Sequence, residues 1–197
     1  MWHFNDVIRW SRPGGKKKGS DGVSGGRKSV LCLAAEGGYV ETATHLIDNQ
    51  QFQGNLNTPV DDDGMTLVMR AVKAEAAHEE SSNTGTVELL LSRNADVNAV
   101  DASGLTALMY ATHHERYQQT VQVLIAANAD IEAEDEDGYT ALMHATRCGH
   151  KDKVKTLLTQ NANVEAADNE GYTALMHAAM RPPEQEERVG DAIVART

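Results

Sequence analysis

Short sets of apolar and small residues recur along the chain at the spacing of an α-helix. Leu108, Ala111 and Thr112 lie at positions i, i+3 and i+4, and the same spacing starts again at Leu142 and Leu175. Residues with this spacing share one face of a helix, and small residues on that face let another helix approach closely. Second triplets accompany them at Val87-Leu90-Leu91, Val121-Leu124-Ile125 and Val154-Leu157-Leu158. The pattern predicts pairs of short helices.

A polar phrase, Asp-x-x-Gly-x-Thr, precedes the first helix of each pair. It starts at Asp61, Asp101, Asp135 and Asp168, with separations of 40, 34 and 33 residues. Its glycine suits a tight turn with positive φ, and its threonine is placed to cap a helix by accepting a hydrogen bond from a first-turn amide. The three clearest turn glycines are Gly104, Gly138 and Gly171. A fixed period of this length is typical of a stacked repeat array, whose unit here is hairpin, helix, turn, helix.

The array contains five copies of this unit, of which the first, starting at Ser29, is degenerate. The copies span about residues 29–60, 61–100, 101–134, 135–167 and 168–197. The second carries an insertion at 73–85, where Lys73–Glu80 is predicted to extend the first helix before a loop returns. The insertion is either a contact element or a tolerated surface loop. In the last copy Arg181-Pro182-Pro183 interrupts the link to a final helix around Ile193.

The copy at 135–166 also carries Gly149-His150, Leu157-Leu158 and the exit segment Asn161-Ala162-Asn163-Val164. With these motifs the chain resembles ankyrin repeat proteins over about residues 29–197. The resemblance implies an all-α repeat solenoid that binds other proteins and is not an enzyme. The family's Thr-Pro-Leu-His is Thr-Ala-Leu-Met here, so methionine packing is expected to replace the histidine hydrogen bond that ties neighbouring hairpins.

Charge divides the chain into a basic start and an acidic array. Residues 1–30 carry a net charge of +5 and the remainder carries −16. An acidic array repels phosphate backbones, so we expect a protein partner with a basic surface and no nucleic acid bound by the repeats. Residues 1–28 are predicted to form a short helix, which caps the first repeat or binds a partner, and a flexible basic linker.

The compartment and the assembly state follow from smaller features. Cys32 and Cys148 are too far apart in a linear stack for a disulfide, which fits a reducing, cytoplasmic compartment. The chain has no apolar run of about 20 residues, so we expect no membrane span. We expect a monomer. The repeated Ala-Leu-Met is similar to that of arrays in protists and intracellular bacteria, where such proteins are often host-directed effectors.

Catalytic and metal chemistry have weak support in the sequence. The stretch 22–29 departs from a phosphate-binding loop because Arg27 stands where a glycine should precede the lysine. Tyr110, His144 and His177 occupy one position in successive repeats, but first helices packed 8–10 Å apart keep two imidazoles from sharing one metal ion. We therefore expect no cofactor and no metal.

The resemblance implies that the hairpin tips and first helices form a concave binding surface. The residues expected to contact a partner there are Met65, Leu105, Tyr110, His113, His114, Tyr139, His144, Arg147, Tyr172, His177 and Arg181. The leading hypothesis is an adaptor or scaffold. The alternative is a regulatory inhibitor that grips an enzyme or basic factor with the array and reaches a second site with residues 1–28. Asn98, in Val-Asn-Ala, also resembles the asparagine hydroxylated in some ankyrin domains, which would be a modification and not the function.

Overall fold

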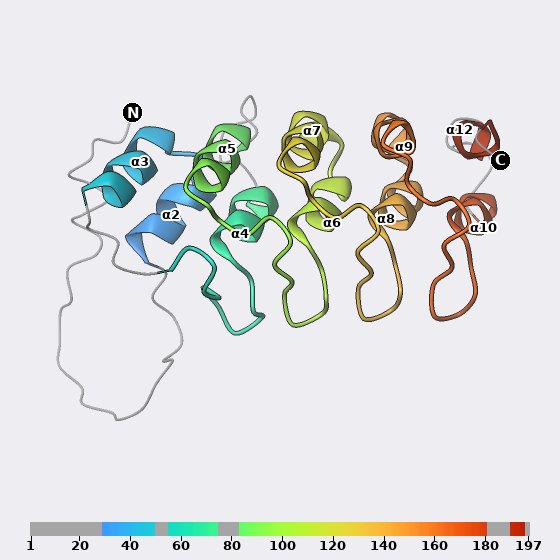
Figure 1. The fold of residues 1–197 in the computed structure, drawn as a ribbon, viewed down its shortest axis with the longest axis horizontal. Helices are drawn as coiled ribbons and strands as arrows, with labels where there is room; N and C mark the ends of the chain where they lie inside the picture. Colours follow the sequence, from blue (N-terminus) through green and yellow to red (C-terminus); the bar gives the residue numbers. More distant parts are fainter. Residues whose placement is uncertain (1–28, 50–54, 75–82, 181–189, 196–197) are drawn as a thin grey trace.

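Two rows of helices stack side by side, and hairpin loops project beyond one of the rows (Figure 1). This computed structural model describes residues 29–49, 55–74, 83–180 and 190–195. The first row consists of α2 (Val30–Glu36), α4 (Leu67–Lys73), α6 (Ala107–Thr112), α8 (Ala141–Cys148) and α10 (Ala174–Ala179). The second row consists of α3 (Val40–Asp48), α5 (Thr84–Ser92), α7 (Gln118–Ala126), α9 (Lys151–Thr159) and α12 (Gly190–Val194). The fold is an all-α repeat solenoid, as the sequence predicts.

The threonine of each repeated phrase caps a first helix, as the sequence predicts. The Thr106 side chain accepts a hydrogen bond from the amide of Met109 at 3.3 Å, and Thr66, Thr140 and Thr173 do the same in their own repeats. In α4 and α6 the methionine sulfur accepts from the threonine amide in return, at 3.4 Å. In these two helices the methionine therefore packs in the core and also closes the helix N-terminus.

Each hairpin depends on a glycine and lies against the next hairpin. Gly138 has a φ of 80°, and a Cβ added there would come within 2.8 Å of the Asn169 amide nitrogen. The positive φ expected for Gly104 and Gly171 is also present, at 76° and 85°. Neighbouring hairpins are tied by backbone hydrogen bonds: Ala102 N to Asp63 O, Glu136 N to Ser103 O, and Asn169 N to Asp137 O. These main-chain bonds tie the hairpins without the family's histidine.

The core is a continuous strip between the two helix rows. Each first helix packs against its neighbours in the row and against the second helix of its own repeat. The leucines and valines that the sequence pattern placed on the inner faces are almost fully buried: Leu108, Leu142, Val87, Leu90, Val121, Leu124, Val154 and Leu157. Because each repeat covers the face left open by the one before it, the apolar surface is buried only in the assembled array.

Two buried donors close the C-terminal ends of first helices, where carbonyl groups lack helical partners. Asn83 donates to the carbonyls of Glu36 and Ala71, at 3.0 Å each. Lys153, on α9, is only 1% exposed, and its ammonium donates to the carbonyl of Ala111 at 2.6 Å and to that of His114. Burial lowers the pKa of Lys153 to about 8. These side chains fix the turns that follow the first helices.

The predicted extension of the first helix in the second repeat is wrong at its start. Helix α4 ends at Lys73, and Ala74 has extended backbone angles, with φ −61° and ψ 119°. The rest of that insertion, 75–82, lies outside the described residues, as do the predicted helix and basic linker of 1–28 and the interruption at 181–183. None of the helices in the described segments is both long and apolar enough to cross a membrane.

Replacing Lys153 with methionine tests its role in the fold. We expect Lys153→Met to lower the free energy of unfolding by about 1–3 kcal/mol, because the carbonyl of Ala111 loses its buried donor. Urea-induced unfolding followed by circular dichroism measures the change. The exposed neighbour Lys155 provides the control, and Lys155→Met should stay within about 0.5 kcal/mol of the wild type. Equal effects of the two substitutions would contradict the assigned role.

Candidate functional site

The first aspartate of each hairpin holds both the hairpin and the first helix. In Asp135, Oδ1 accepts the amides of Asp137 and Tyr139, at 3.0 and 2.8 Å. Its other oxygen, Oδ2, accepts from Nε2 of His144 at 2.8 Å. One carboxylate therefore shapes the turn and orients a side chain that projects from α8.

The same arrangement recurs with a different side chain in each repeat. The partner of the aspartate lies nine residues further along: Arg70 for Asp61, Tyr110 for Asp101, His144 for Asp135 and His177 for Asp168. For Asp168, burial opposes the charge, but hydrogen bonds from the Tyr172 amide and from His177 outweigh it and lower the pKa. The carboxylate is therefore ionised and acts as an acceptor, which places the hydrogen of His177 on Nε2.

The side chain of His113, in the third repeat, contacts the fourth repeat. Its Nε2 lies 3.1 Å from Nδ1 of His144, whose own Nε2 bonds Asp135. Because Nε2 of His144 donates, its Nδ1 accepts the hydrogen from His113. From the sequence, imidazoles at the same position of successive repeats were expected to lie too far apart to share one metal ion. His113 lies one turn further along its helix, and from there it reaches His144 directly. In the described part of the chain, no three His, Cys, Asp or Glu side chains gather as a metal site would require.

Tyrosine and histidine rings form a continuous series along the hairpins and first helices, which we call the ring surface. Its members are Tyr110, His113, His144, Tyr139, His177 and Tyr172, and neighbouring ring centroids lie 5.0–6.3 Å apart. Two cations border the series, since the Lys73 ammonium lies 5.1 Å from the ring of Tyr110 and the Arg147 guanidinium lies 4.6 Å from that of Tyr139. Edge-to-face and cation–π contacts of this kind hold side chains at fixed places on a surface.

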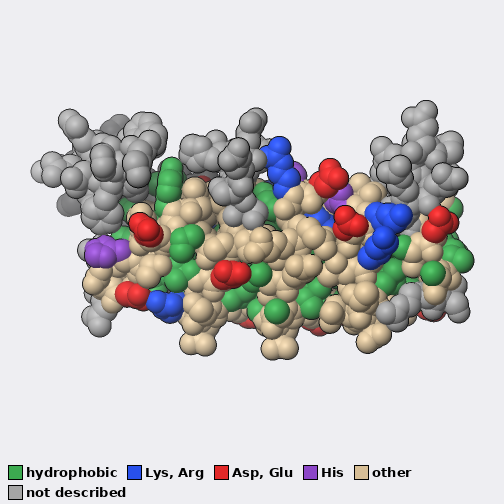
Figure 2. Space-filling model, turned by 90° about the horizontal axis from the view of Figure 1, so that it is seen from above, with side chains coloured by type: hydrophobic (Ala, Val, Ile, Leu, Met, Phe, Trp, Pro, Cys, Tyr) green, Lys and Arg blue, Asp and Glu red, His purple; other side chains and the backbone are tan. Residues whose placement is uncertain are grey.

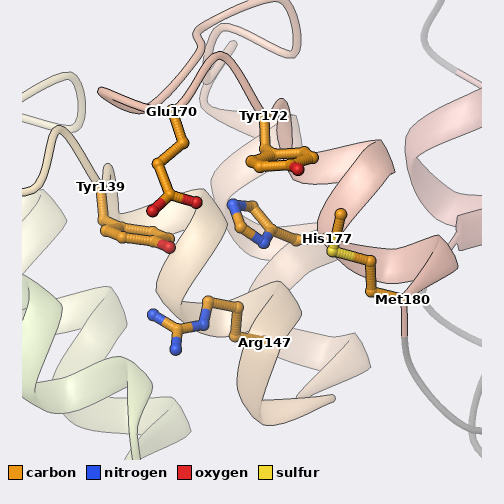
Figure 3. A pocket seen from close by; sticks show the side chains of 6 residues that line it. All are labelled: Tyr139, Arg147, Glu170, Tyr172, His177 and Met180. Atoms are coloured by element: carbon orange, nitrogen blue, oxygen red, sulfur yellow. The ribbon is translucent and has the colours of Figure 1, made fainter.

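The ring surface ends in a pocket of about 390 Å³. Tyr139 and Tyr172 lie on either side of His177, with Glu170 on the hairpin side and Arg147 on the helix side (Figure 3). Met180 completes the lining and is 60% exposed. The pocket therefore combines aromatic walls with one carboxylate and one guanidinium at opposite edges.

The predicted partner-binding residues divide into supports and accessible groups. Met65 is fully buried, so its placement at a partner-contacting tip was wrong, because its side chain turns into the core after Gly64. Tyr110 and His144 are each 8% exposed and act as supports of the surface. The accessible or half-buried members are Leu105, His113, His114, Tyr139, Arg147, Tyr172 and His177. Arg181 lies outside the described residues.

The aspartates were not recognised as positioning residues. The sequence contains a signal for this role, because Asp101, Asp135 and Asp168 each precede a hydrogen-bonding side chain by nine residues.

The face formed by the second helices shows no comparable cluster of side chains among the described residues. Figure 2 looks onto the second helices, where acidic and basic side chains are scattered and do not gather into one patch.

The comparisons with known proteins agree with this architecture. A family model of ankyrin repeats matches three overlapping segments, residues 31–135, 75–168 and 116–188. These matches cover most of the chain, and the chain belongs to the ankyrin repeat family. Ankyrin repeats generally mediate protein–protein interaction, and the family is typically non-enzymatic. No curated protein matches the sequence.

The buried histidine bond predicts a dependence of stability on pH. Burial lowers the pKa of His113 from 6.5 to about 4, and the charges of His144, His114, Lys153 and Arg147 act in the same direction. Between these two values the unfolded chain binds more protons than the folded one, so the free energy of unfolding decreases as the pH falls through this range. The loss should be smaller in His113→Gln, whose amide can donate without titrating.

Thermal unfolding at about pH 7 and about pH 4.5 measures this difference between the variants. His114→Gln, at an exposed neighbouring position, is the control and should keep the wild-type pH dependence. If His113→Gln loses as much stability as the wild type on acidification, the histidine pair does not carry the effect.

Proposed function

We propose that this protein is an adaptor or scaffold that binds a protein partner through the ring surface. The observation that carries the proposal is the continuous series of ring contacts from Tyr110 to Tyr172. Hydrogen bonds to the hairpin aspartates hold the rings of Tyr110, His144 and His177 in place before any partner arrives, which lowers the entropy lost on binding. Aromatic residues and arginine are the side chains that most often dominate binding energy at protein interfaces.

The chemistry of the partner follows from the charges that surround the rings. The hairpin tips next to them expose carboxylates at Asp62, Asp63, Glu136, Asp137 and Glu170. A partner with a basic surface would be attracted to this rim and would associate faster at low ionic strength. The proposed partner is therefore a protein segment rich in lysine or arginine, bound by one copy of the chain.

The cellular setting belongs to the same proposal. No disulfide joins Cys32 and Cys148, the two cysteines of the sequence, which supports an assignment to the reducing interior of a cell. The alternative inhibitor role rests on residues 1–28, which lie outside the described residues.

Affinity capture with matched variants tests the proposal. The bait carrying Tyr172→Ala and Met180→Ala should retain at least about tenfold less of a specific partner than the wild type, because it loses an aromatic contact at the end of the ring surface. Its melting temperature should stay close to that of the wild type, since Tyr172 contacts mainly His177 and Met180 is exposed. Quantitative mass spectrometry of the captured proteins gives the comparison.

The control bait is Gln122→Ala and Lys155→Ala, which alters exposed positions on α7 and α9 in the other helix row. It should capture the partner as well as the wild type does. If instead the control loses the partner and the Tyr172 variant retains it, the binding surface lies on the second helices and the proposal is wrong.

A further inference from the structure

One position at the end of the first helix carries different residues in successive repeats, and a pocket lies beside one of them. His113 and Arg147 occupy the same place, seven residues after the capping threonines Thr106 and Thr140. His113 places its imidazole against His144 of the next repeat, with a nitrogen separation of 3.1 Å. Arg147 instead lies over Tyr139. His177, which is the equivalent of His144 one repeat later, lines the open pocket.

His177 presents a hydrogen-bond acceptor in that pocket. Its Nε2 donates to the ionised carboxylate of Asp168 at 2.7 Å, which leaves a lone pair on Nδ1. No hydrogen bond to this nitrogen occurs among the described residues, whereas Nδ1 of His144 accepts from His113. The array therefore contains its own example of what fits beside this imidazole: a planar group that carries an N–H donor.

The aromatic walls and the charges of the pocket indicate which chemical group can bind there. The rings of Tyr139 and Tyr172 flank His177, and a planar cation stacks well on such rings. Glu170 lines the pocket, and the carboxylate of Asp168 lies behind His177. Among the described residues that line the pocket, Arg147 is the only arginine or lysine. The described side chains at the pocket therefore contribute two negative charges and one positive charge, which favours a positively charged occupant.

We propose that this pocket binds an arginine side chain of the protein partner. The guanidinium lies against Tyr172, pairs with the carboxylate of Glu170 and donates an N–H to Nδ1 of His177. A guanidinium suits these three contacts because it is planar and carries several donors, whereas the ammonium of lysine is a compact point charge. The inference rests on the proposed function, since it names the side chain that the ring surface recognises.

Selection of peptides on the immobilised chain tests the proposal. Peptides displayed on phage in a random library are selected on the wild type and eluted, and the enriched sequences should share one arginine. Synthetic versions of an enriched peptide are then titrated by fluorescence anisotropy with arginine, lysine or citrulline at that place. Citrulline keeps the planar shape and the N–H donors but carries no charge. Both replacements should weaken binding by about tenfold or more, because each removes one of the features that the pocket recognises.

The protein variants assign the effect to the pocket. Glu170→Gln should remove most of the preference for arginine over citrulline, because it removes the paired carboxylate while keeping the shape of the side chain. The matched control is Glu165→Gln, at an exposed position outside the pocket lining, and it should leave the preference unchanged. Circular dichroism melting curves confirm that both variants are folded.

Other outcomes overturn the pocket assignment. Enrichment of peptides without arginine, enrichment of acidic peptides, failure to enrich any peptide, or an arginine preference that survives Glu170→Gln would each contradict it. The proposed function is judged separately by the capture comparison with Tyr172→Ala and Met180→Ala. A partner lost by that bait together with an arginine-independent peptide would keep the interaction module and remove only the arginine pocket.

Discussion

The two oxygens of the hairpin aspartate organise this protein. One oxygen accepts backbone amides and sets the turn, while the other holds a side chain of the first helix, as in the pairs Asp135–His144 and Asp168–His177. Because the turn and the helix share one carboxylate, the hairpin cannot tilt without breaking a bond to the helix behind it. The backbone bonds between hairpins then pass this geometry from one repeat to the next. The ring surface is a consequence of that constraint.

The repeat varies its surface while its frame stays constant. Arg70, Tyr110, His144 and His177 fill one position with three kinds of side chain, and each reaches the aspartate of its own hairpin. One turn further along, His113 bonds the neighbouring histidine, whereas Arg147 lies over the ring of Tyr139. The surface contacts at this position therefore differ between repeats, while the capping threonines and the buried leucines stay the same.

The elements that local chemistry sets were predictable from the sequence, and the contacts between repeats were not. Gly138 and Thr140 predicted the turn and the helix cap, and the apolar spacing that starts at Leu142 and at Val154 predicted the pair of helices. Met65 was misplaced because a residue in a turn can point inward or outward, and only the packed neighbours decide which. The bond from His113 to His144 could not be foreseen, because it depends on how far one repeat is displaced and rotated from the next.

We expect the hairpin aspartates to fix the tautomer and orientation of His144 and His177 in the ring surface. Long-range proton–nitrogen NMR correlation spectra of the imidazoles at neutral pH measure the tautomer directly. His144 and His177 should both carry their hydrogen on Nε2, and replacing Asp168 with alanine should release His177 alone. A hydrogen on Nδ1, or rapid averaging between the two tautomers in the wild type, would contradict the claim.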